Sequence, residues 1–124
     1  MELNTKNAEN LKKMYNLTMH REEEQDIKIF QEHGFYIDPT PLLVSPPYGQ
    51  TPADPEVIQR YARLTVEGIP EDADAVLIGG LTDLMIYIYN IIKEKRPEIE
   101  IYIAITRKEE GGRDYKVIGL RRVV

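Results

Sequence analysis

The chain has 124 residues, which allows one hydrophobic core and is too short for two. Hydrophobic residues make up 42% and charged residues 30% of the chain, a balance that argues against wholesale disorder, and the absence of cysteine excludes a disulfide framework, a thiolate zinc site and a cysteine nucleophile. A net charge of −5 argues against a general binder of long nucleic acids, because such a protein needs a basic face.

No membrane-spanning segment is expected. The longest apolar run, 84–92, is far shorter than the roughly twenty residues that span a bilayer. No basic segment followed by an apolar one marks a signal peptide. Together with the absence of cysteine, these features predict a soluble cytoplasmic protein without a membrane partner.

The first predicted elements are an arm, a strand and a helix. Residues 1–12 are expected to form a polar N-terminal arm, and residues 13–124 a single α/β domain. In the segment 13–19, apolar and polar residues alternate as in a strand. The segment 21–33 predicts a helix, because its apolar residues have helical spacing and its first turn is acidic. Gly34 is a natural end for that helix.

The middle of the chain predicts a broken strand, a loop and a second helix. Residues 35–44 can hold a strand that is interrupted by two prolines, and residues 45–55 read as a loop rich in proline. Asp54 followed by proline is typical of a helix start, which predicts a helix over 55–67. The apolar residues expected on one face of this helix are Val57, Tyr61 and Leu64.

The C-terminal half predicts a strand, a turn, a helix and two more strands. Residues 73–78 form a continuous apolar run, as in a buried central strand, and two glycines follow. Thr82 or Asp83 is then expected to cap a helix that runs to about Lys95. Residues 100–106 predict a buried strand parallel to the preceding one. A final strand or hairpin arm is expected over 115–124.

The segment between the glycines and Pro97 also permits a β-hairpin, because isoleucine and tyrosine favour strands. We prefer the helix for its length and its end signals, with Leu84, Ile88, Ile91 and Ile92 facing the sheet. Such a helix is apolar almost all round. Its outer face is therefore expected to be buried in a homodimer.

The glycine turn is the first candidate site. Gly79 and Gly80 lie between a predicted buried strand and a helix start, and open parallel sheets bind ligands at the carboxyl ends of their strands. There the backbone amides can hold a phosphate, with Thr82 as an additional donor. An ordinary tight turn is an equally good interpretation. Asp83 argues against an anion, and the pattern matches neither the dinucleotide fingerprint nor the P-loop.

Two basic residues follow the next strand. Arg107 is suited to grip a phosphate with two hydrogen bonds, and Lys108 adds a point charge. Both are expected at the same sheet edge as the glycine turn. The alternative is a solvated strand end, in which they pair with Glu109 and Glu110.

His20 and Tyr48 are the remaining candidates. His20 ends the first predicted strand, and histidine titrates near neutrality, so it is the natural general acid or base. A lone histidine is more often structural. Tyr48 in the proline loop can stack on a base, although anchoring the loop to the core is the more common role. No residues stand at metal-ligand spacing, so neither a metal nor another cofactor is expected.

Three short segments resemble small CRISPR-associated proteins. These are residues 16–20 (NLTMH) with Glu24 and Gln25 behind them, residues 76–80 (VLIGG) and residues 102–107 (YIAITR). Together they cover about a quarter of the chain. Some members of this broad group are ring nucleases, which degrade cyclic oligoadenylate messengers in antiviral defence.

The resemblance implies a Rossmann-like homodimer with a cyclic oligoadenylate bound across its two-fold axis. Gly79, Gly80 and Thr82 would cradle phosphate, Arg107 would neutralise charge in the transition state, and His20 would assist proton transfer. Cleavage would use the ribose 2′-hydroxyl in line with the phosphorus and would need no metal.

Two other functions remain open from the residues alone. A non-catalytic interaction protein would dimerise through the apolar helix and act by binding partners. A module for a mononucleotide or another small anion would use the same glycine turn.

Overall fold

The computed structural model describes residues 10–47, 49–108, 110–111 and 115–123. Most of the expected N-terminal arm and Tyr48 lie outside these residues. The helices and strands, in chain order, are β1 (Lys12–Leu17), α2 (Glu24–Glu32), β2 (Phe35–Asp38), α3 (Pro55–Glu67), β3 (Ala75–Ile78), α4 (Thr82–Lys95), β4 (Glu100–Lys108) and β5 (Tyr115–Arg122).

The five strands form one sheet in the order β2-β1-β3-β4-β5. The first four are parallel, and β5 runs antiparallel to β4. This mostly parallel sheet, flanked by helices, confirms the predicted α/β class and is Rossmann-like. The parallel pairing of β3 with β4 was predicted from the apolar runs and the helix between them.

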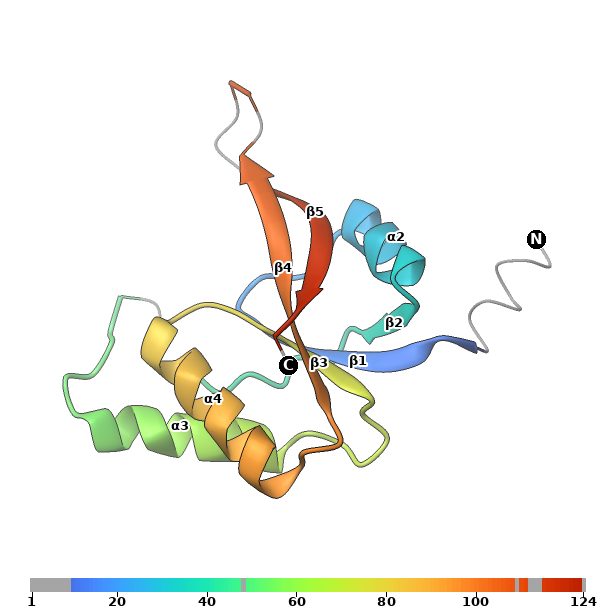
Figure 1. Ribbon diagram of the computed structural model, residues 1–124. Coiled ribbons are helices and arrows are strands. Elements are labelled where there is room, and N and C mark those ends of the chain that lie inside the picture. Colours follow the sequence, from blue (N-terminus) through green and yellow to red (C-terminus); the bar gives the residue numbers. More distant parts are fainter. Residues whose placement is uncertain (1–9, 48, 109, 112–114, 124) are drawn as a thin grey trace.

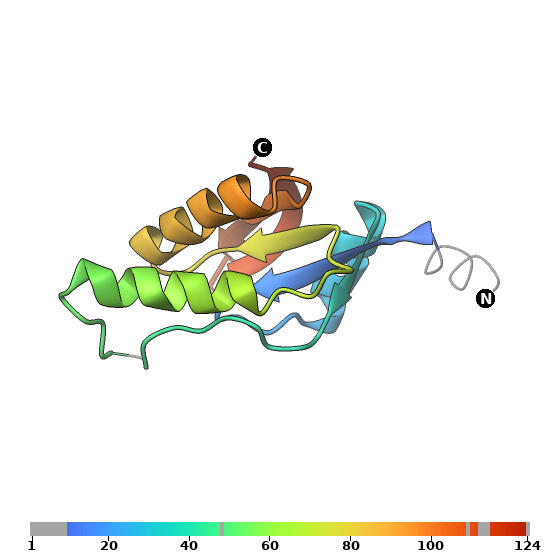
Figure 2. The ribbon, with the colours of Figure 1, turned by 90° about the horizontal axis from the view of Figure 1, so that it is seen from below.

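Helices cover both faces of the sheet, with α2 on one side and α3 and α4 side by side on the other (Figures 1 and 2). Successive side chains of a strand point to opposite faces of the sheet, so each strand can contribute residues to the hydrophobic core on either face. In β3, Val76 and Ile78 pack in the cluster beneath α3 and α4, while Ala75 and Leu77 pack in the cluster that contains Phe30 of α2.

Helix α3 begins as predicted, because the Asp54 side chain accepts a hydrogen bond from the Glu56 amide at 2.9 Å and proline occupies the first turn. Its predicted inner face was wrong. Leu64 is 46% exposed, and Val57 and Tyr61 are only partly buried. The buried residues of α3 are Ile58, Ala62, Thr65 and Val66.

Thr65 is completely buried, and its hydroxyl has hydrogen-bond partners within the protein. Its oxygen accepts from the Val44 amide at 2.9 Å, and the hydroxyl lies 2.9 Å from the Tyr61 carbonyl oxygen and 3.2 Å from that of Val44. The polar side chain therefore joins the long loop before α3 to the helix.

The segment after the glycines is the helix α4, so the hairpin alternative was wrong. Leu84, Ile88 and Ile92 are buried as predicted, while Ile86 is 50% exposed. The predicted cap was also wrong. The N-cap is Leu81, whose side chain makes no capping hydrogen bond.

Strands β4 and β5 continue beyond the parallel sheet as a two-stranded arm (Figure 1). The predicted end of β4 at residue 106 was too early, since the strand reaches Lys108. Burial is confirmed only for its first part, because Ile101 is buried and residues 105–108 are exposed. A register shift between Ile105 and Thr106 marks a β-bulge in the arm.

No helix in the described part of the chain is long and apolar enough to cross a membrane. Within the same residues, no group of three or more histidine, aspartate or glutamate side chains is placed to hold a metal ion.

Candidate functional site

The order in which strands are added to the sheet reverses between the parallel neighbours β1 and β3. From β1 it passes through α2 to β2 on one side, and from β3 it passes through α4 to β4 on the other. Since the two following helices cover opposite faces, the loops after β1 and β3 diverge at the carboxyl edge. In open α/β sheets this switch point is the usual ligand site. We call residues 18–23 the β1 loop and residues 79–81 the β3 loop.

The two loops are in direct contact. A Cβ atom at Gly79 would lie 3.3 Å from Thr18 Cγ2, so the bare glycine backbone fits against the threonine methyl. Gly80 has φ +103°, a conformation that L side chains rarely adopt, and a Cβ atom there would meet nothing within 4 Å. The β3 loop is therefore tightly packed at its first glycine and open at its second.

The start of α4 faces the same edge. The Met85 amide donates to the Leu81 carbonyl at 2.9 Å, and the Leu84 amide donates to Asp83 Oδ1 at 3.0 Å. The first two amides of the helix, those of Thr82 and Asp83, come too early in the helix for an intrahelical acceptor. They are available to an anion, although the Asp83 carboxylate weakens the positive end of the helix.

Asn16 organises the β1 loop, and the sequence reasoning did not single it out as a site residue. Its side chain is 9% exposed and makes hydrogen bonds to Thr18, His20 and Glu22. Asn16 stands among the buried residues Met14, Tyr15 and Leu17 in the second half of β1, and a polar residue between apolar ones was the available signal. His20 itself is exposed on this loop, two residues after Thr18, the residue that contacts Gly79.

Arg107 and Lys108 lie in the arm, beyond the last pair that joins β4 to β3. The last pair between β3 and β4 joins Leu77 to Tyr102, and Arg107 lies five residues further along β4. That is roughly 16 Å beyond the level of Leu77 at about 3.3 Å per residue, and the glycines themselves follow Leu77 by two and three residues. Arg107 instead faces Lys116 directly across the arm, a pairing of like charges that costs stability.

Shifted pKa values are found at the other end of β1. Lys13 Nζ lies 2.7 Å from Asp72 and 3.6 Å from Asp38, and the Tyr15 hydroxyl donates to Asp72 at 2.7 Å. The hydrogen bond from Lys13 lowers the pKa of Asp72, and the same bond raises the pKa of Lys13. Both groups are therefore held in their charged forms at neutral pH. The cluster connects β1 to the segment before β3, and neither Lys13 nor Asp72 is suited to exchange a proton at neutral pH.

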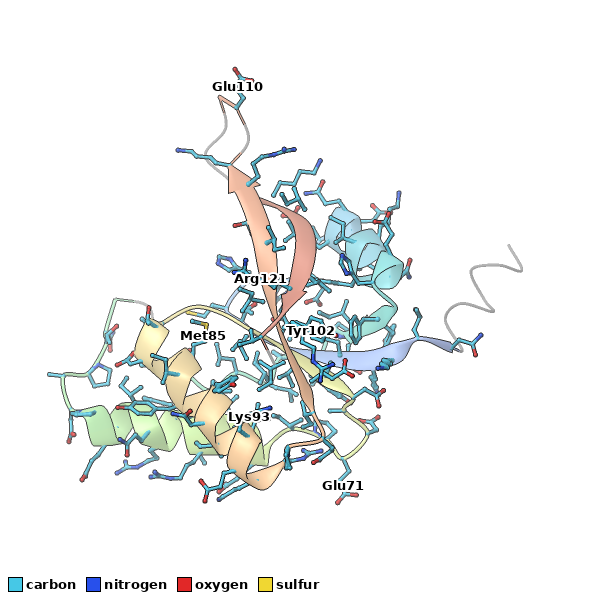
Figure 3. The ribbon with its side chains drawn as sticks, viewed as in Figure 1. Glu71, Met85, Lys93, Tyr102, Glu110 and Arg121 are labelled. Carbon is cyan, nitrogen blue, oxygen red and sulfur yellow. The ribbon has the colours of Figure 1, made fainter. Side chains whose placement is uncertain are left out.

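A hollow of about 280 Å³ lies between α3 and α4 and is also far from the glycines. Its lining includes Glu71, Lys95 and Arg96, at the amino edge of the sheet. Figure 3 shows Glu71 at the opposite end of the molecule from Glu110, which lies in the arm. Arg96 donates hydrogen bonds to the carbonyl oxygens of Ile69 and Pro70, so its guanidinium serves the fold.

Comparison with models of known protein families, with curated proteins and with solved structures finds no match to this chain.

Proposed function

We propose that this chain binds a cyclic oligoadenylate at the two switch-point loops and acts on it as a metal-independent ring nuclease. The observation that carries the proposal is the switch point itself, where Gly79 packs on Thr18 and the start of α4 has no cap from its N-cap side chain. The three short sequence resemblances support the choice of ligand.

The phosphate contacts follow from the backbone. Gly80 leaves open space where another residue would place a side chain, so a phosphate can approach the chain closely. The amides of Thr82 and Asp83 then face the anion, and the exposed Thr82 hydroxyl adds a donor. A ring with two or more phosphates can direct one of them away from the Asp83 carboxylate.

The position of the basic residues favours a ligand with several phosphates. Arg107 and Lys108 lie beyond the same edge of the sheet as the glycines, in the arm, and Arg107 is roughly 16 Å past Tyr102 of the last β3–β4 pair. A cyclic oligonucleotide offers several phosphates to these groups, and in a homodimer each subunit presents the same groups to a symmetric ring.

The reaction requires no added co-reactant. The ribose 2′-oxygen forms a bond to phosphorus as the bond to the 5′-oxygen breaks, which leaves a 2′,3′-cyclic phosphate and a 5′-hydroxyl. His20 accepts the proton of the 2′-hydroxyl or returns it to the leaving oxygen. Arg107 stabilises the charge that develops on the phosphoryl oxygens.

The test is incubation of the purified protein with cyclic tetra-adenylate and cyclic hexa-adenylate in the presence of a chelator. We expect linear products by chromatography, and we expect Arg107→Ala and His20→Ala to reduce the rate by roughly 100-fold or more. Arg63→Ala, an exposed change on α3, is the matched control and keeps the wild-type rate.

A non-catalytic interaction protein is the second candidate. It is favoured by the half-exposed Ile86 on α4 and by Ile105 and Ile118 in the arm, which are 36% and 44% exposed. If the ligand stays intact but raises the melting temperature of the protein, the protein is a sensor of this ligand and not a nuclease. Intact ligand without any stabilisation would leave this second candidate as the better one.

A further inference from the structure

The β1 loop is folded around one buried side chain. Asn16 Oδ1 accepts hydrogen bonds from the Thr18 amide at 2.9 Å and from the Thr18 hydroxyl at 2.6 Å. Its Nδ2 donates to the His20 carbonyl at 2.8 Å and to Glu22 Oε2 at 2.9 Å. Both hydrogens of the amide group and both lone pairs of its oxygen are therefore used.

The neighbouring groups also fix which way the Asn16 amide points. The Thr18 amide can only donate and the His20 carbonyl can only accept, so exchanging the oxygen and nitrogen of Asn16 would break both bonds. The Thr18 hydroxyl gives its hydrogen to Asn16 and receives one from the His20 amide at 3.2 Å. The methyl of the same side chain lies against Gly79.

We infer that Asn16 is the positioning residue of the switch-point site. It does not contact the ligand. Asn16 acts through Thr18, which sets the spacing between the β1 loop and the β3 loop. It also holds the backbone of His20 and thereby fixes the position from which the imidazole side chain extends. The inference rests on the proposed function for its ligand, while the loop geometry that it invokes is independent of any ligand.

The test exploits the polarity of the amide. In Asn16→Asp the side chain keeps its size but presents an acceptor to the His20 carbonyl and to the Glu22 carboxylate. We expect the affinity for cyclic tetra-adenylate to fall about tenfold or more. We also expect faster hydrogen exchange at the Thr18 and His20 amides, measured without ligand.

A second substitution is expected to rescue the first. In the double variant Asn16→Asp, Glu22→Gln, the glutamine amide can donate to the new carboxylate, which restores one of the two lost hydrogen bonds, so part of the lost affinity and exchange protection returns. Glu22→Gln alone is the reference for the double variant, because the glutamine oxygen still accepts from Asn16. A side chain that merely stabilised the protein would leave the affinity of the folded Asn16→Asp variant unchanged.

The outcomes separate this inference from the proposed function. If the unsubstituted protein does not bind cyclic tetra-adenylate, the proposed function fails, and hydrogen exchange alone decides the role of Asn16. Wild-type exchange and affinity in Asn16→Asp would overturn the inference, as would a loss that the double variant leaves unchanged. If Asn16→Asp fails to fold, the neutral Asn16→Ser takes its place, because serine is too short to reach His20 and Glu22.

Discussion

Replacing Phe30 by alanine is expected to lower the free energy of unfolding by about 3–5 kcal/mol. Phe30 is 2% exposed and belongs to the cluster that includes Met14 and Leu77 of the sheet. The only other buried residue of α2 is Asp26, whose carboxylate accepts from the Glu23 amide at the start of the helix. Phe30 is therefore the main apolar anchor of α2, and domains of this size have only about 5–15 kcal/mol in total.

Chemical denaturation monitored by circular dichroism measures this loss. Ile27→Ala is the matched control on the same helix, because Ile27 is 36% exposed and its truncation is expected to cost well under 1 kcal/mol. A loss below 1 kcal/mol for Phe30→Ala would contradict the packing of α2 on the sheet through this side chain.

The largest effect on ligand binding is expected from Gly79→Val. A Cβ atom at this position already approaches Thr18 Cγ2 to 3.3 Å, and the two further methyl groups of valine force Thr18 to move. Because the Thr18 hydroxyl is bonded to Asn16 and to the His20 amide, the whole β1 loop moves with it. We expect the affinity for cyclic tetra-adenylate to fall roughly 10- to 100-fold.

Two alanine substitutions make the comparison quantitative. Gly79→Ala is expected to lie between wild type and Gly79→Val in affinity, because it adds only the tight Cβ contact. Gly119→Ala in the arm adds a Cβ atom 3.7 Å from Ile105 Cδ1, an ordinary contact, and is expected to bind normally. Isothermal titration calorimetry on the folded variants gives the affinities. Unchanged binding in Gly79→Val would remove the β3 loop from the site.

The elements that the sequence predicted well are those whose ends are marked by glycine or proline. The apolar run that ends at Ile78 became the central strand β3, and the segment from Thr82 to Lys95 became α4. In both cases glycine or proline marks an end, and the number of residues between these marks distinguishes a strand from a helix.

The errors have separate physical causes. The inner face of α3 was misjudged because a second apolar series with helical spacing, Ile58, Ala62 and Val66, is the one that packs in the core. Thr65 joins this face through its hydrogen bonds to Val44. The N-cap of α4 is Leu81 because the Asp83 carboxylate bonds to the next amide instead. The end of β4 was missed because an exposed two-stranded arm needs no apolar residues at its tip.

The candidate site was predictable only in part. The glycines and His20 were identified from their place after two apolar strands, and the structure puts them at one edge. The separation of Arg107 from them depends on how far β4 continues beyond β3, which the residues of β4 alone do not specify. Asn16 was missed because its importance lies in its four hydrogen bonds within one loop.

The central claim is that the ligand binds at the switch-point loops, and chemical-shift mapping of the ¹⁵N-labelled protein tests it most directly. On titration with cyclic tetra-adenylate, we expect the largest shifts at the amides of Thr18, Gly79, Gly80 and Thr82. Saturable binding whose shifts are confined to the hollow between α3 and α4 would contradict the claim, as would the absence of any shift.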